Sequence, residues 1–226
     1  MPNQPTFVAF LESFPNLRSL ELVRNLFPWS LEGHLSECHL PKLHRLKLDQ
    51  TVETDVLFVV KTLEVLNVSL YSHSTPLVRS LSNLQHLEMY FVWQVDLLDA
   101  ISRDGPIDGD LQTIRSLTVE LREDAAFAPI LGGLAYRDLY GGAGILLPIL
   151  SKLTVRFRGA ISPHNRTILT NTLLDVVKAR HIPVQAGPGP FETLELQGPD
   201  PLEDYLNEES IVWFREHVDL RFVNIP

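Results

Sequence analysis

One short pattern, apolar-x-x-apolar-x-apolar, recurs along the whole chain and constrains its fold more than any other feature. Its seven copies begin at Leu17, Leu43, Leu63, Leu84, Ile114, Leu150 and Phe191. One such unit cannot bury its apolar side chains alone, so neighbouring units must stack and share a continuous core. The sequence therefore predicts a repeat protein.

The spacing within each copy predicts a strand. The second and third apolar residues are separated by one residue, which is typical of a short strand with one buried face. Parallel strands need crossovers between them, and the segments between copies supply these. We expect an α/β leucine-rich-repeat solenoid over 1–226, with short parallel strands on the concave face and helices and loops on the convex face. An eighth, degraded copy at Arg215, Val218 and Leu220 predicts a capping repeat near 211–226.

The segments between copies predict helical material of different lengths. The clearest helix runs from about Thr167 to Arg180, with Asn165 as its N-cap. Its apolar stripe consists of Leu169, Leu173, Val176 and Val177. The segment Pro76–Leu81 predicts about one helical turn, and residues 95–101 repeat apolar side chains at three-residue steps.

Charge and cysteine usage exclude several classes of function. A formal net charge of -9 argues against a nucleic-acid partner, because such binding relies on clustered Lys and Arg. No apolar stretch approaches the roughly 20 residues of a membrane span, and Met1–Pro5 lacks the start of a secretory signal. The single cysteine, Cys38, cannot form an internal disulfide. We expect an intracellular monomer, cytoplasmic or nuclear, without a membrane partner.

None of the motifs that accompany catalysis is complete. Gly141–Gly144 lacks the Gly-Lys-Ser/Thr ending of a phosphate loop and reads better as a turn. Cys38 and His39 lack a thiol-nucleophile signature, and a half-buried cysteine before a strand is the simpler interpretation. Asp96 and Asp99 could pair as carboxylates in an acid/base site, but solvated helix charges are the favoured interpretation. We predict no catalytic residues, no cofactor and no metal, and therefore no enzymatic activity.

The residues between the apolar positions predict a polar face. Successive side chains on a strand point to opposite sides, so these residues must line the side away from the core. A merely soluble sheet face explains their mixed charges, whereas a recognition surface is the usual role of a solenoid's concave side. For partner binding we predict Arg45, Lys47, Asp49, His86, Glu88, Tyr90, Glu120 and Arg156. Tyr90 is the favoured anchor, since interface hot spots are enriched in aromatic residues. The same spacing places Asp219 of the eighth copy beside Glu195.

Three segments, Phe14–Leu22, Leu40–Leu48 and Leu81–Met89, resemble the leucine-rich repeats of fungal F-box proteins. The helical segment 174–180, followed by 191–196, is similar to the C-terminal repeats of that family. In the family, an F-box precedes the repeats and docks on a ubiquitin-ligase adaptor. Here only sixteen residues precede Leu17, so we expect adaptor binding only if an F-box is supplied upstream.

The resemblance implies a non-enzymatic protein-binding module. Its role would be substrate recognition in an F-box-type ubiquitin-ligase receptor, with a ubiquitination substrate as the protein partner. The alternative is a stand-alone leucine-rich-repeat scaffold, or a truncated paralogue, with no ligase role. Association with the ligase adaptor distinguishes the two hypotheses.

Overall fold

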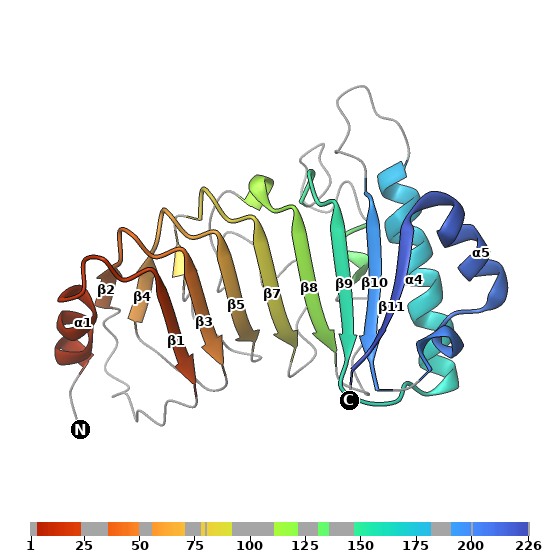
Figure 1. The fold of residues 1–226 in the computed structure, drawn as a ribbon, viewed down its shortest axis with the longest axis horizontal. Coiled ribbons are helices and arrows are strands. Elements are labelled where there is room, and N and C mark those ends of the chain that lie inside the picture. Colours follow the sequence, from red (N-terminus) through yellow and green to blue (C-terminus); the bar gives the residue numbers. More distant parts are fainter. Residues whose placement is uncertain are drawn as a thin grey trace.

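The dominant feature of the fold is a parallel sheet. The computed structural model describes residues 4–23, 36–49, 56–70, 78–79, 81–91, 111–121, 131–135, 147–181, 191–199 and 201–225. Eight strands form the sheet: β1 (Ser19–Val23), β3 (Arg45–Asp49), β5 (Val65–Leu70), β7 (His86–Phe91), β8 (Ser116–Leu121), β9 (Lys152–Phe157), β10 (Thr193–Gly198) and β11 (Asp219–Asn224). They lie side by side in chain order, each parallel to its neighbours (Figure 1). The prediction of an α/β fold with parallel strands is confirmed.

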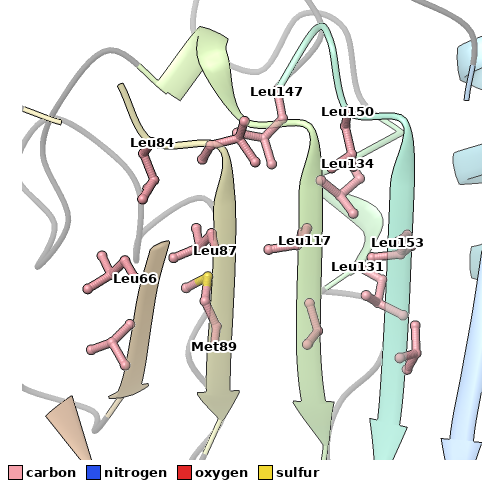
Figure 2. Close-up of a cluster of buried hydrophobic side chains, with 14 of the residues drawn as sticks. Leu66, Leu84, Leu87, Met89, Leu117, Leu131, Leu134, Leu147, Leu150 and Leu153 are labelled. Atoms are coloured by element: carbon pink, nitrogen blue, oxygen red, sulfur yellow. The ribbon is translucent and has the colours of Figure 1, made fainter. Parts of the chain in front are cut away.

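The apolar pattern runs across this sheet as two ladders. The second apolar residues of the copies pair in the order Leu20, Leu46, Leu66, Leu87, Leu117, Leu153 and Leu194. The third apolar residues pair in the order Leu22, Leu48, Val68, Met89, Val119, Val155 and Leu196. All are buried except Leu20 on the first strand, which is partly buried. Figure 2 shows the central part of this core beneath β7, β8 and β9. The register predicted for all seven copies is therefore correct.

Hydrogen bonds at the strand entries tie each copy to the previous one. The Arg18 carbonyl oxygen accepts the backbone N–H groups of both His44 and Arg45. The same pair of hydrogen bonds to one acceptor recurs at the carbonyl oxygens of His44, Glu64, Gln85, Arg115 and Ser151. The hydroxyl of Thr62 also donates to the Leu43 carbonyl at 2.9 Å. A slip of one residue would move every apolar side chain to the polar face, so these bonds reinforce the register that burial favours.

A second parallel sheet covers part of the core behind the first strands. It contains β2 (Ser36–His39), β4 (Val56–Val59) and β6 (Val78–Arg79). In the segment Pro76–Leu81 the predicted helical turn is wrong, because Val78 and Arg79 pair with β4 as a strand. The spacers here are short, and extended backbone satisfies its N–H and C=O groups by pairing with the neighbouring spacer.

Cys38 belongs to this second sheet. It lies in register with Phe58, which pairs in turn with Val78, and all three side chains are fully buried. The expectation of a half-buried side chain is therefore wrong; Cys38 does precede the repeat strand β3, but it lies within a strand of its own. Burial, with the nearby Glu12 carboxylate, raises the pKa of the Cys38 thiol to about 12. A thiol with so high a pKa holds its proton at neutral pH, and Cys38 is a core residue rather than a nucleophile.

Helices close the two ends of the sheet (Figure 1). The helix α1 (Gln4–Glu12) lies at the β1 end, and α4 (Pro163–His181), α5 (Glu208–His217) and the 3₁₀ turn η2 (Leu202–Tyr205) lie at the β11 end. A further 3₁₀ turn, η1 (Leu111–Thr113), precedes β8. The helix α4 confirms the predicted helix, including its buried stripe of Leu169, Leu173, Val176 and Val177.

The start of α4 and the register of the last copy both need correction. The Ser162 hydroxyl, rather than Asn165, caps α4, since it accepts the Asn165 backbone N–H at 3.3 Å. In the last copy, β11 pairs Leu220 with Leu194, two residues later than predicted. The helix α5 continues through His217, so the strand can begin only at Asp219. Arg221, not Asp219, is consequently the neighbour of Glu195.

Candidate functional site

The polar face of the eight-stranded sheet centres on Arg156 in β9. Its Nη1 donates to Glu88 at 2.7 Å and lies 3.5 Å from Glu120, and its Nε donates to Gln197 at 2.8 Å. Glu88 stands on β7, two strands away and diagonal to Arg156, since Arg156 lies opposite Glu120 in the register and Glu88 lies opposite Thr118. The long arginine side chain crosses β8 to reach it. One guanidinium therefore joins residues of four strands.

Both carboxylates that meet Arg156 have additional partners. Glu120 also accepts a hydrogen bond from Nε of Arg158, and only 6% of its side chain is exposed. Glu88 accepts from the side-chain amide of Asn67 on β5 at 2.9 Å. An ionised carboxylate at this depth is costly unless cations and hydrogen bonds compensate for the lost water, and here they do.

A second ion pair extends the network toward β10 and β11. Nζ of Lys152 donates to Glu195 at 2.8 Å, and the Gln197 side-chain amide donates to the other oxygen of that carboxylate. Burial alone would raise the pKa of Glu195. These two hydrogen bonds, with the positive charges of Lys152 and Arg221, outweigh burial and hold the pKa below its ordinary value.

These contacts form a continuous network that we call the charge belt. Its members are Asn67, Glu88, Glu120, Lys152, Arg156, Arg158, Glu195 and Gln197. Seven of them lie on the five neighbouring strands β5, β7, β8, β9 and β10, and the eighth, Arg158, directly follows β9. Positive and negative side chains alternate within it, so its charges are held in fixed positions before any partner arrives.

The structure brings together some of the predicted partner-binding residues and separates others. Glu88, Glu120 and Arg156 contact one another at the centre of the charge belt. His86 lies on the same strand as Glu88. Lys47 instead pairs with Glu21 at 2.6 Å, near the β1 edge. Arg45 is exposed on β3, two strands from His86 in the register.

Two predicted residues are only partly described. The backbone of Asp49 pairs with Val23, and that of Tyr90 pairs with Ser69 and Glu120. Their side chains lie outside the described part of the structure, as do Asp96, Asp99 and the glycine cluster 141–144. The segment 95–101, predicted to be helical, is also outside it.

Five members of the charge belt were not selected from the sequence: Asn67, Lys152, Arg158, Glu195 and Gln197. A usable signal existed: Lys152 and Glu195 have opposite charges on adjacent copies, and their positions differ by one column of the polar face. The contact between Glu88 and Arg156 had no such signal, because it joins copies that are not neighbours.

Among the described residues, no three His, Cys, Asp or Glu side chains converge where they could hold a metal ion. No helix in the described ranges is both long and apolar enough to cross a membrane.

No protein-family model, curated protein or solved structure matches the chain. The fold and the site define an α/β protein with a mostly parallel eight-stranded sheet and a charged polar face.

His86 makes the stability of this face depend on pH. Burial lowers the pKa of His86, the Glu88 carboxylate opposes this, and the positive charges of Lys152 and Arg156 lower it further. The folded protein therefore favours neutral His86, and the unfolded chain binds the proton more readily. We expect this contribution to stability to be complete above the ordinary pKa of 6.5 and to be lost as the pH falls below it.

The measurement is the urea midpoint of unfolding at several pH values between about 5 and 8. His86→Gln, which has no charge to gain, is expected to reduce the slope in that range. His164→Gln on the exposed first turn of α4 is the matched control and should keep the wild-type slope. A wild-type slope in His86→Gln would contradict the assignment.

Proposed function

We propose that the chain is a leucine-rich-repeat solenoid that binds a protein partner through its polar face and catalyses no reaction itself. The observation that carries the proposal is the charge belt, in which Arg156 joins carboxylates and an amide from three other strands. Such pre-positioned charges reduce the cost of ordering side chains on binding. They also favour partners with complementary charges and disfavour others.

We further propose that the partner is a ubiquitination substrate and that the chain is the substrate-recognition part of an F-box-type receptor. Support comes from the resemblance of Phe14–Leu22, Leu40–Leu48 and Leu81–Met89 to the repeats of fungal F-box proteins. In this proposal the protein is intracellular and monomeric, without nucleic-acid or membrane partners. It binds the ligase adaptor only through an F-box supplied upstream. The alternative proposal is a scaffold or truncated paralogue with no ligase role.

Adaptor association separates these two proposals. The full-length native gene product is purified from its own cells and tested for the ligase adaptor by quantitative mass spectrometry. The receptor proposal expects the adaptor in stoichiometric amounts and ubiquitin on the captured partner. A captured partner without the adaptor would reject the receptor role and leave the scaffold.

A double substitution on β7 tests the polar face itself. Tyr90→Ala with Glu88→Ala is expected to weaken partner binding by at least about tenfold, because it removes an aromatic residue, a type enriched at interface hot spots, and one charge of the polar face. The measurement is the dissociation constant for the captured partner. Glu208→Ala with Glu209→Ala, on the exposed first turn of α5, is the control and should leave binding unchanged. Unchanged affinity in the β7 variant, with folding intact, would remove this patch from the binding surface.

A further inference from the structure

A row of exposed cations lies along the side of the large sheet where its strands begin. The turns before the strands stack on one another there. The Thr62 hydroxyl donates to the Pro41 carbonyl at 3.1 Å, and the Asn83 amide donates to the Lys61 carbonyl at 2.8 Å. This side is the upper margin of the sheet in Figure 1. Five exposed cations lie in these turns and at the entries of β1, β3, β5 and β8, and we call them the basic edge: Arg18, Lys42, Arg45, Lys61 and Arg115.

The cations of the basic edge differ from those of the polar face in having no carboxylate partner. The polar face has five cations that each form an ion pair with a carboxylate, namely Lys47, Lys152, Arg156, Arg158 and Arg221. Within the described ranges, no carboxylate pairs with any cation of the basic edge. Only Lys42 has a side-chain hydrogen bond, at 2.7 Å to the neutral side chain of Asn16. The polar-face cations therefore stabilise the fold, whereas those of the basic edge make no ionic contact within it.

The charge of the basic edge is opposite in sign to that of the whole molecule. The chain has a formal net charge of -9. Among the described residues of this side between β1 and β8, the five cations are accompanied by one carboxylate, that of Glu64, which lies 3.2 Å from the His44 ring. Complementary potentials steer a partner toward a surface and select among partners. The basic edge therefore favours an anionic partner.

The length of the basic edge limits the kind of anion that fits it. From β1 to β8 there are four steps between strands of about 4.8 Å each, so the edge is about 19 Å long. Exposed carboxylates lie toward both ends, at Glu12 of α1 and at Glu192 before β10. An acidic segment of about six extended residues keeps all its charges over the edge. A longer nucleic acid extends past both ends, where its further phosphates meet the acidic remainder of the molecule and are repelled.

We propose that the basic edge binds a short acidic segment of the partner protein, whose glutamate or aspartate side chains pair with these five cations. This inference rests on the proposed function, because the segment belongs to a protein docked on the polar face. It adds the charge, the length and the position of the segment, which crosses the amino ends of the strands from β1 to β8.

The first test uses a peptide probe and needs no partner. N-acetylated, C-amidated hexaglutamate with an uncharged fluorophore is titrated with the protein at about 0.1 M salt, and fluorescence anisotropy reports binding. The matched probe is the same peptide with glutamine at every position. We expect saturable binding of the glutamate peptide that weakens as the salt concentration rises, and binding of the glutamine peptide that is at least about tenfold weaker. Equal binding of both peptides, or binding of neither, would overturn the proposal.

Matched variants locate the bound peptide. Arg45→Gln with Lys61→Gln removes two cations that have no carboxylate partner, so the fold should be unaffected. Peptide binding should weaken by at least about threefold, since each exposed ion pair contributes little. Lys178→Gln with Arg215→Gln, at exposed positions of α4 and α5, changes the net charge equally and is the control. At about 0.1 M salt, charges more than about 10 Å away are screened, so the control should not change binding. Equal weakening in both variants would refute the location.

A nucleic-acid probe tests the class of the partner. Oligothymidine long enough to pass both ends of the basic edge is titrated under the same conditions. We expect it to bind more weakly than the glutamate peptide. Tighter binding of oligothymidine, lost in Arg45→Gln with Lys61→Gln, would overturn the assignment of the edge to an acidic protein segment.

The dissociation constant of the captured partner distinguishes this inference from the proposed function. We expect Arg45→Gln with Lys61→Gln to weaken the partner as it weakens the peptide. A partner weakened by Tyr90→Ala with Glu88→Ala but not by the edge variant would reject the basic edge and leave the proposed function standing. A partner weakened only by the edge variant would support the basic edge and count against the role of the polar face.

Discussion

Replacement of Leu117 by alanine is expected to lower the free energy of unfolding by about 2 to 5 kcal/mol. Leu117 is fully buried on β8 and pairs in the register with Leu87 on one side and Leu153 on the other. It occupies the second apolar position of the fifth copy, near the middle of the stack. Removal of its side chain leaves a cavity that parallel strands on both sides cannot easily fill, because their backbones are held by ladder hydrogen bonds.

Urea unfolding of Leu117→Ala against wild type provides the measurement. Val212→Ala, at a side chain of α5 that is 58% exposed, is the control and should change stability by less than about 0.5 kcal/mol. Wild-type stability of Leu117→Ala would contradict the register assigned to the fifth copy and, with it, the stacking of its neighbours.

Replacement of Arg156 by methionine is expected to lower the free energy of unfolding by about 1 to 3 kcal/mol. Methionine keeps much of the apolar stem but removes the guanidinium, so Glu88 and Glu120 lose a cation while they stay largely shielded from water. The side chains of these glutamates are only 17% and 6% exposed. Arg158 and Asn67 retain their contacts with the two carboxylates, which keeps the loss below that of a fully orphaned charge.

Two comparisons separate this effect from a simple loss of charge. Lys47→Met breaks the more exposed pair with Glu21 and should cost no more than about 1 kcal/mol. Addition of Glu120→Gln to Arg156→Met should restore part of the lost stability, because the amide removes the buried charge. If Arg156→Met proved no more destabilising than Lys47→Met, the charge belt would have no special role in the fold.

The strands of the large sheet could be predicted because burial and periodicity agree in each of the seven copies. The apolar residues alternate with polar ones, and every second position faces a core that no single copy could enclose. The β2–β4–β6 sheet could not be predicted in this way. Among the described side chains, each of its strands contributes one that is fully buried, namely Cys38, Phe58 or Val78, and the spacers share no common motif. The structure of these spacers is decided by backbone pairing between neighbouring copies. The sequence of a single spacer gives no information about that pairing.

The ends of the chain show a second limit of sequence reasoning. Near β11 the repeat pattern predicted Val218 and Leu220 as the second and third apolar residues of the strand. The length of α5 decides the register instead, because the helix continues through His217 and the strand begins at Asp219. Near α4 the hydroxyl of Ser162 competes with Asn165 for the cap, and the serine position allows Pro163 to open the helix. In both places a neighbouring element, rather than the repeat pattern, sets the boundary.

The candidate site could be predicted as a face but not as a network. Alternation placed His86, Glu88, Glu120 and Arg156 on one side of the sheet, and the structure agrees. The partner of each charge depends on side-chain length and on the neighbours over which it extends. Arg156 reaches Glu88 diagonally across β8 because its side chain is long, and Lys47 pairs with Glu21 because those two lie directly opposite.

The central claim, that the polar face binds the partner, is tested most directly by hydroxyl-radical footprinting of the free protein and of its complex with the captured partner. Reactive side chains mark three separate regions: His86 on the polar face, Phe10 in α1 with Phe14 just after it, and Trp213 on α5. We predict that the partner protects His86 and leaves the aromatic residues at both ends unchanged. Protection confined to Phe10 and Phe14, or to Trp213, with His86 as reactive as in the free protein, would contradict the account.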